Sequence, residues 1–283
     1  MSAPAPRPPR LAALTPPLSA PLNPEALGGA VARLLAEGGA HNRLVLEGAR
    51  GFMVLSAARG GAVVRVQASA SAEVAGARRE LAEGEAQRLY DLGFRRRTAA
   101  DPFEQSLPSY GEGDRLALAA LTASLMGDLY LEGAPLSARL YLGDAPQVDG
   151  ARLSEAMRRA SEARDHSSRQ SLYWAFVRGR LLLAVEGPAE EGAPLSAARP
   201  RSFKGLTSYE SAAVFTGWEE ALRYDARGLD VLECRGRELL PPLLERGVGS
   251  LLINPRGRLG GEFYRNELAS MDEAMRAWEG ERR

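Results

Sequence analysis

The chain has 283 residues, of which 45% are hydrophobic and 25% charged, and 36 acidic and 36 basic residues give a formal net charge of +0. This length predicts two globular domains. The balanced charge excludes an overall electrostatic attraction to nucleic acid or to an anionic membrane surface. Lys204 is the only lysine, and we interpret the many arginines as the composition of a GC-rich bacterial genome.

The cysteine count indicates a reducing compartment. Cys234 is the only cysteine, so no disulfide can form within the chain. Neither a signal peptide nor an apolar run of about 18 residues is recognisable. We therefore expect a cytoplasmic protein that does not bind a membrane. Residues 1–23 are rich in proline and are expected to form an extended, disordered tail.

The first half begins with signals for a helix and an antiparallel meander. Asn23 is a predicted N-cap, Pro24 suits the first helical position, and apolar residues follow at helical spacing up to Gly38. Three short apolar runs between residues 43 and 69 are separated by glycine-containing turns and predict three strands. In the third run apolar and polar residues alternate, as expected when one side of a sheet faces water.

The first domain is predicted to end with a helix, a short strand, a leucine-rich helix and a last strand. The helix over residues 82–92 is expected to end at Gly93 in a left-handed cap. The segment FEQSLPSY follows, and then the helix carrying a leucine stripe over residues 116–131. Residues 136–142 alternate as a strand, so the domain is placed at residues 24–143.

The pattern LYDLGFRRRTAADPFEQSLPSY, followed by a leucine-rich helix, resembles the YbjN and type III secretion chaperone-like (TY-Chap) domains. The matching positions are Leu92, Gly93, Phe94, Asp101, Pro102 and Phe103, with Phe94 where such domains usually have tryptophan. The resemblance implies an α/β sandwich of a bent antiparallel sheet flanked by helices. It also implies a domain that is often dimeric and binds polypeptide.

The second half begins after the turn-rich segment GDAPQVDG and is placed at residues 150–283. A polar helix, a second helix over LYWAFVRG and a buried strand from Arg180 are expected first. In AAVFTGWEEALRYD, Thr216 and Glu219 have the spacing of a capping box, and Trp218 lies on the same helix face as Leu222. Next come a strand over LDVLECRG and a helix broken at the Pro241-Pro242 pair.

The segment VGSLLIN predicts a buried strand that ends at Asn254 and Pro255. A phosphate site is disfavoured because the glycines precede this strand and no helix is expected before an N-cap at Asn266. The last helix carries an apolar stripe that predicts a core face, formed by Leu268, Met271, Met275 and Trp278.

Several motifs of this half, in order over residues 151–279, resemble the SseB N-terminal family. The residues that carry the likeness are Phe215, Thr216 and Trp218, the segment 236–240, and LLINP with its glycine-rich turn. Gly217 stands where the family usually has serine. Together the two halves predict an α/β fold of the α+β type, with two domains that each have a mostly antiparallel or mixed sheet flanked by helices.

No residue pattern predicts catalysis, a metal site or a cofactor. His41 and His166 lack partners at metal-ligand spacing, and Cys234 is interpreted as a small buried hydrophobe. Lys204 has an arginine-rich setting that suggests exposure rather than activation by burial. Fingerprints of nucleotide-binding loops and serine hydrolases are missing from the sequence.

We therefore expect a non-catalytic, chaperone-like module that binds a polypeptide at a sheet edge and in grooves beside helices. Candidate anchors, each more often a core residue than a contact, are Phe103, Tyr110, Trp174 and Tyr209. A homodimer through the first half is also expected. The alternative is a small-ligand sensor or an enzyme that uses a cleft between the halves, with Arg256 and Arg258 near an anionic ligand.

Overall fold

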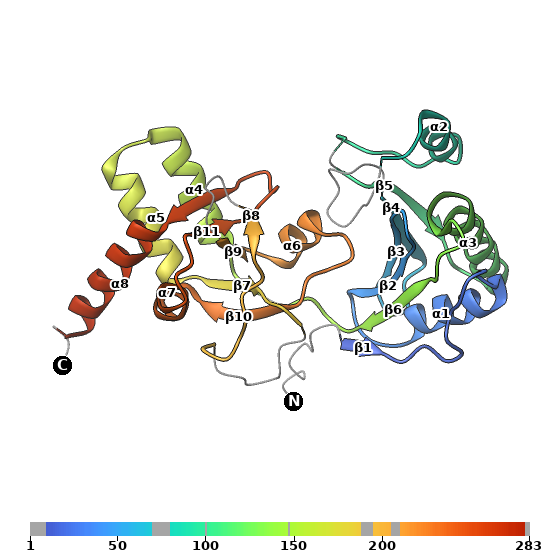
Figure 1. Cartoon of the computed structure of the whole chain (residues 1–283), viewed down its shortest axis with the longest axis horizontal. Helices are drawn as coiled ribbons and strands as arrows, with labels where there is room; N and C mark the ends of the chain where they lie inside the picture. Colours follow the sequence, from blue (N-terminus) through green and yellow to red (C-terminus); the bar gives the residue numbers. More distant parts are fainter. Residues whose placement is uncertain are drawn as a thin grey trace. The chain divides into compact units, whose positions relative to one another are not determined.

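The computed structural model describes residues 10–69, 80–99, 101–146, 148–187, 195–204 and 210–280. The chain divides into two compact units, one of Met1–Ala145 with Asp225–Arg227 and the other of Pro146–Tyr224 with Gly228–Arg283. Each unit contains helices and a six-stranded sheet of its own (Figure 1). The predicted α+β fold class is confirmed.

The first unit follows the predicted order of elements after one additional strand. Its elements are β1 (Arg10–Ala12), α1 (Pro24–Ala36), β2 (Asn42–Glu47), β3 (Phe52–Ala57), β4 (Val63–Ala68), α2 (Glu83–Asp91), β5 (Phe103–Pro108), α3 (Glu112–Leu125), the π-helical turn η1 (Met126–Leu131) and β6 (Ser137–Leu142).

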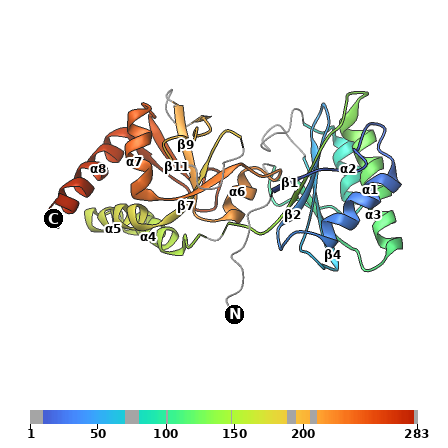
Figure 2. The same cartoon turned by 90° about the horizontal axis from the view of Figure 1, so that it is seen from below.

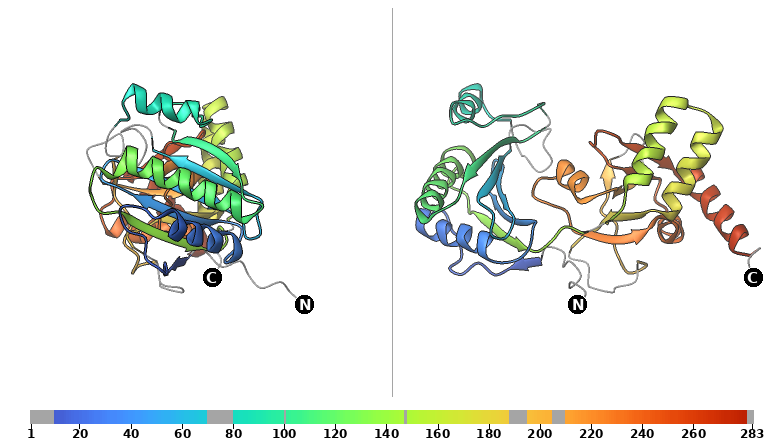
Figure 3. Two further views of the ribbon diagram at one scale, coloured as in Figure 1. Left: turned by 90° about the vertical axis from the view of Figure 1, so that its right-hand side faces the viewer. Right: turned by 180° about the vertical axis from the view of Figure 1, so that it is seen from behind.

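All neighbouring strands of the first sheet are antiparallel, in the order β1-β6-β2-β3-β4-β5. Helices α1 and α3 lie across one face of this sheet (Figure 3). Their leucines pack with the inward side chains of the strands in one core. In β4 the predicted alternation is confirmed, because Val64 and Val66 are buried whereas Val63 and Arg65 are exposed.

The proline-rich tail is not disordered throughout. Residues Arg10–Ala12 form β1 and pair with β6, and Leu18 and Leu22 are buried in the core of the first unit. The prediction of a disordered segment up to residue 23 is therefore wrong for the residues from Arg10 onward. Composition marks such a segment as unable to form a core of its own, but a few apolar side chains are enough to attach it to a core that already exists.

Gly93, the second residue after α2, has the expected left-handed conformation. Gly93 has φ +91°, and the amide of Phe94 donates to the carbonyl of Leu89 at 3.0 Å. This is the bond of a glycine-terminated helix end, and it directs the fully buried Phe94 into the core. The Leu-Gly-Phe triplet therefore ends α2 and anchors it.

The second unit contains α4 (Ala151–Ala163), α5 (His166–Arg178), β7 (Arg180–Ala184), β8 (Phe203–Lys204), β9 (Glu210–Phe215), α6 (Trp218–Tyr224), β10 (Val231–Arg235), α7 (Gly236–Glu245), β11 (Ser250–Ile253), β12 (Gly261–Tyr264) and α8 (Arg265–Gly280). Its strand order is β10-β7-β9-β11-β12, with β8 beside β9. Only β9 and β11, among the paired strands described, run parallel.

Four helices of this unit supply its core, and Figure 2 shows α4 and α5 side by side as a hairpin. Side chains of α4, α5, α7 and α8 pack on one sheet face. The predicted stripe of α8 is confirmed as a core face, since Leu268, Met271 and Met275 are buried and Trp278 is partly buried. Within the described residues, no helix has the length and apolarity needed to cross a membrane.

Two predictions for this unit are wrong. Helix α7 continues through Pro241 and Pro242. Proline cannot donate to the carbonyl four residues earlier, and the residues at those positions, Arg237 and Glu238, lie on the exposed side of the helix. Strand β12 was not predicted, and α8 follows it directly from Arg265 instead of beginning after an N-cap at Asn266. Its four residues contain a glycine and a glutamate, which strand propensity disfavours.

Candidate functional site

Two residues of the SseB-like motifs meet in the second unit at the ends of the parallel strands β9 and β11. The backbone amide of Thr216 donates to Oδ1 of Asn254 at 2.8 Å, and Nδ2 of Asn254 donates to Oγ1 of Thr216 at 2.9 Å. Both residues are buried. We call this pair the Thr216–Asn254 clamp.

The capping box predicted for Thr216 and Glu219 is not formed. Helix α6 begins at Trp218, the amide of Ala221 donates to the carbonyl of Gly217, and Glu219 is exposed. The hydroxyl of Thr216 bonds to Asn254 instead. Local spacing predicted a helix cap, but the side chain makes a bond between two strands that are 38 residues apart in sequence.

The clamp also holds the beginning of α4. Oγ of Ser154 donates to Oγ1 of Thr216 at 3.4 Å. Gly150, just before α4, packs so closely that a Cβ atom there would lie 1.9 Å from the carbonyl oxygen of Thr216. The position of the α4–α5 hairpin over the sheet therefore depends on the same corner.

On its other side the clamp shapes the loop that leads to β12. Asn254 has φ +46° and Arg256 φ +63°, left-handed conformations that are uncommon for residues other than glycine. The amide of Gly257 donates to the carbonyl of Asn254 at 2.7 Å, and Nδ2 of Asn254 reaches the carbonyl of Leu259 at 3.3 Å. The strain at Asn254 is thus offset by bonds that fix where β12 begins.

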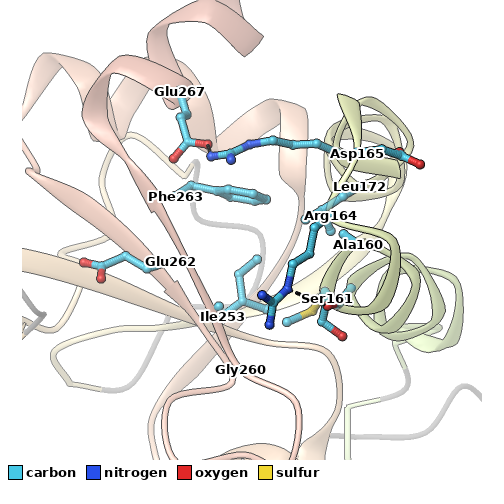
Figure 4. Close-up of a pocket in the computed structure, with 13 residues that line it drawn as sticks. Ala160, Ser161, Arg164, Asp165, Leu172, Ile253, Gly260, Glu262, Phe263 and Glu267 are labelled. Carbon is cyan, nitrogen blue, oxygen red and sulfur yellow. Dashed lines mark hydrogen bonds and ion pairs between the residues drawn. The ribbon is translucent and has the colours of Figure 1, made fainter. Parts of the chain in front are cut away.

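A pocket of about 320 Å³ lies between the hairpin and β12 (Figure 4). The residues that line it come from the end of α4, the start of α5, the strand ends and the first turn of α8. They are Met157, Ala160, Ser161, Arg164, Asp165, Arg169, Leu172, Ile253, Gly260, Gly261, Glu262, Phe263 and Glu267. Apolar side chains form the floor, and charged groups stand at the rim.

The pocket exists because β12 begins with a residue that has no side chain. A Cβ atom on Gly261 would lie 3.5 Å from Cε of Met157, so any larger side chain there would point into the space beneath α4. The next residue on the same strand face is Phe263, which is buried against Phe176 with ring centroids 5.1 Å apart. The pocket is open over Gly261 and closed at Phe263.

The acidic groups at the rim already have partners. Glu267 accepts from Nη2 of Arg169 at 2.5 Å and from the hydroxyl of Tyr173 at 2.6 Å. Burial acts to raise the pKa of Glu267, but these bonds and one from the Tyr264 amide outweigh it and leave the pKa below its ordinary value. Asp165 accepts from the amide of Ser168 at the start of α5, and this bond lowers its pKa.

Glu262 points to the opposite face of the sheet, as Figure 4 shows. There its Oε1 accepts from the hydroxyl of Ser250 at 2.5 Å. Its carboxylate therefore does not contribute a polar group to the interior of the pocket. The remaining charge at the mouth is that of Arg164.

The outer edge of β12 lies beside this pocket. The amide of Asn254 donates to the carbonyl of Val214 on β9. Backbone groups alternate in direction along a strand, so those of Leu251 and Ile253 point toward β12. Their partners are Phe263 and Gly261, which leaves the backbone groups of Glu262 and Tyr264 on the outer edge. The amide of Tyr264 is bonded to Glu267 at 3.0 Å. In the described parts of the chain, β12 pairs with β11 alone.

The four aromatic candidates are not gathered at one site. Phe103 is fully buried in the first unit, with its ring centroid 4.9 Å from that of Tyr90, so the prediction of a surface anchor there is wrong. Tyr110 is 76% exposed. Trp174 is partly buried, 6.3 Å from Trp278 between ring centroids. Tyr209 lies outside the described residues.

The other motif residues are structural. Phe215 and Trp218 are buried, Pro255 is half-buried between the two left-handed residues, and Leu92 is 38% exposed beside Gly93. The guanidinium of Arg256 lies 5.6 Å from the ring centroid of Tyr224.

The candidates for chemistry remain separate from one another. His41 is half-buried and His166 exposed, and the described residues contain no group of three His, Cys, Asp or Glu that could hold a metal ion. Burial raises the pKa of the Cys234 thiol to about 12, which removes its nucleophilic character near neutral pH. Lys204 lies in β8.

Sequence reasoning missed Arg164, Gly261 and Phe263. The only sequence signal for the pocket was the Gly260-Gly261 doublet before an aromatic residue. A glycine at the start of a strand can mark a close approach or an open space. Whether Gly261 marks a close approach or an open space can be decided only from the position of α4.

Comparison with known proteins supports the assignment of the second half. The comparisons with curated proteins and with solved structures give no match. A family model described as the SseB protein N-terminal domain matches residues 153–270, a range that contains the clamp and the whole lining of the pocket. The second unit of this chain is therefore similar to the SseB protein N-terminal domain.

Proposed function

We propose that the protein is a non-catalytic, chaperone-like module whose second unit binds an extended segment of another polypeptide. The segment adds to the outer edge of β12 and places an apolar side chain in the pocket. The observation that carries this proposal is the position of the pocket, which opens over Gly261 on an edge strand. Backbone pairing at a sheet edge combined with a side-chain pocket is a general way to recognise peptides.

The short edge explains why the pocket is needed. Strand β12 has four residues, and the amide of Tyr264 is already bonded, so few backbone bonds are available to a ligand. An apolar side chain buried among Met157, Leu172 and Ile253 would add about 1.5–3 kcal/mol for a residue of the size of leucine or valine. The pocket would therefore supply much of the affinity and the specificity.

The test is selection from a displayed library of random twelve-residue peptides on the full chain. Each selected peptide is then measured against Gly261→Leu, whose side chain fills the pocket. The matched control is Gly113→Leu, an exposed helical position where an added Cβ atom would have nothing within 4 Å. We expect Gly261→Leu to lose at least tenfold in affinity while Gly113→Leu binds like wild type. Equal binding to all three proteins, or no selected peptide, would contradict the proposal.

For the first unit, we propose the YbjN and type III secretion chaperone-like fold and self-association into a homodimer. The antiparallel sheet with α1 and α3 on one face and the Leu-Gly-Phe anchor support the fold. Edge strand β1 supports self-association, because Leu11 at its centre is 65% exposed. Sedimentation should give a dimer at micromolar concentration and a monomer for Leu11→Lys. A wild-type monomer at high micromolar concentration would contradict this.

The alternative function, a small-ligand sensor or an enzyme using Arg256 and Arg258, has weaker support. The guanidinium of Arg256 lies over the ring of Tyr224, and Arg258 is exposed. A thermal-shift panel of nucleotides and amino acids separates the two classes of function. Consistent stabilisation by one ligand class would favour the sensor.

A further inference from the structure

The charges around the pocket differ in how well they are neutralised. Glu267 is paired with Arg169, Asp165 accepts the Ser168 amide, and Glu262 is bonded to Ser250 on the other face of the sheet. Each acidic group that lines the pocket therefore has a partner of its own. This leaves the basic side chains as the groups that decide which charge a ligand should carry.

Arg164 is the basic side chain without an acidic partner at this site, among the residues that the structure describes. It follows α4 in a left-handed conformation, with φ +53°. Its side chain makes one bond to the described residues, a long one of 3.4 Å from Nε to the carbonyl of Ser161. Figure 4 shows its guanidinium hanging over the pocket between Ile253 and Ser161.

The geometry of an extended segment shows how one ligand could reach both Arg164 and the apolar floor of the pocket. Side chains i and i+2 of an extended segment lie on the same face, about 6.5–7 Å apart. Consider a bound segment that pairs with β12 and places one side chain over Gly261. The side chains two positions before and two positions after it then lie on the same face of the sheet. One of the two neighbours then lies toward the Gly260 end, near Arg164 (Figure 4).

Resting on the proposed function, we propose that the pocket selects an extended segment in which an acidic residue stands two positions from an apolar one. The apolar side chain enters the space over Gly261, and the carboxylate pairs with the guanidinium of Arg164. The choice of an acidic residue rests on charge complementarity. A carboxylate of the ligand would meet the Arg164 guanidinium, which has no acidic partner among the described residues. An ammonium group of the ligand would meet only carboxylates that already have partners. Arginine also suits carboxylate geometry, since its fork can donate two parallel bonds.

The experiment uses the full chain and labelled twelve-residue peptides with a central leucine in a Ser/Thr background. Three peptides carry Glu, Gln or Lys at the two positions that lie two residues before and two residues after the leucine. Both ends of each peptide are blocked. Fluorescence anisotropy should show that the Glu peptide binds about 1.5-fold to fivefold more tightly than the Gln peptide, the range expected for an exposed ion pair. The Lys peptide should bind most weakly. The preference for Glu should shrink as salt is raised.

Arg164→Gln should abolish the Glu preference without changing the affinity for the Gln peptide, and Arg164→Lys should retain part of it. The control is Arg152→Gln, an exposed arginine in the first turn of α4, which should leave the preference intact. Equal binding of the Glu and Gln peptides, or a preference that survives Arg164→Gln, would overturn this inference.

The outcomes separate the two proposals. If the peptides bind and Gly261→Leu abolishes binding, but no charge preference exists, the proposed function stands and the acidic specificity is wrong. If no peptide binds wild type, both fail. The same peptides with a free C-terminus are measured as a second set. Tight binding in that set alone, whatever the residues beside leucine, would identify a chain end as the ligand and overturn the internal acidic residue.

Discussion

The side chain of Asn254 bonds to both the backbone amide and the hydroxyl of Thr216, at 2.8 Å and 2.9 Å. This pair joins two parallel strands where they leave the sheet. Through Ser154 it holds α4, and through the turn after Asn254 it sets the start of β12. The pocket lies between these two elements, so this buried polar pair helps to determine the shape of the site.

Replacement of Asn254 should therefore destabilise the protein. Asn254→Ala leaves the buried amide of Thr216 without its partner and places alanine at φ +46°. We expect a loss of about 2–4 kcal/mol in the free energy of unfolding, from the unpaired amide and the strained backbone. Urea denaturation measures it. The control Asn266→Ala, at an exposed position, should stay within about 0.5 kcal/mol of wild type. Similar losses of unfolding free energy in the two variants would show that the Thr216–Asn254 clamp does not stabilise the protein.

Two glycines beside the site should respond oppositely to alanine. At Gly150 the added Cβ would meet the carbonyl oxygen of Thr216 at 1.9 Å, which requires the backbone to move. At Gly261 it would meet Met157 at an ordinary 3.5 Å. Thermal unfolding should show a marked fall in Tm for Gly150→Ala, and a stability equal to wild type or raised by up to about 1 kcal/mol for Gly261→Ala. A destabilised Gly261→Ala would mean that the space over β12 is not empty.

The ion pair of Glu267 should make stability depend on pH. Its pKa is lowered in the folded state, so its contribution is present above the unfolded pKa of about 4.3 and is lost as the pH falls through the folded value. Because Arg169 is 61% exposed, we expect about 1 kcal/mol at pH 7. The difference in unfolding free energy between wild type and Glu267→Gln should be constant from about pH 6 to 8 and decrease below about pH 4. The control Glu273→Gln, exposed on the same helix, should show no such difference.

The Cys234 thiol should be unreactive in the folded protein. With a pKa of about 12, its thiolate is rare at pH 8, and the side chain is buried. Labelling by iodoacetamide at pH 8 should be at least about a hundredfold slower than for an ordinary thiol with a pKa near 8.5. In urea the rate should become ordinary. Rapid labelling without denaturant would indicate that β10 opens readily.

The sequence predicted the elements with strong periodicity and clear ends. Helix α1 with its Asn23 cap, the β2–β4 meander and the α8 stripe all occur, because each rests on contacts between neighbouring residues or on one repeated pattern. Strands β1 and β12 were missed because they are short edge strands whose pairing depends on a partner distant in sequence.

The candidate site was harder to predict for the same reason. Thr216 and Asn254 were identified as motif residues, but their direct bond needs the parallel pairing of β9 and β11. Arg164 lies in a polar helical segment where sequence gives no reason to prefer one arginine over its neighbours. Its role follows from the position of α4 over Gly261, which no local pattern encodes.

The most direct test of the account is hydrogen–deuterium exchange on the full chain, with and without a saturating selected peptide. An added strand should protect the amide of Glu262, the outward donor of β12 that is left for a ligand, and slow exchange should extend to the segment around Arg164. Unchanged exchange at residues 261–264 with a bound peptide, or protection confined to the first unit, would show that the polypeptide binds elsewhere and would contradict the account.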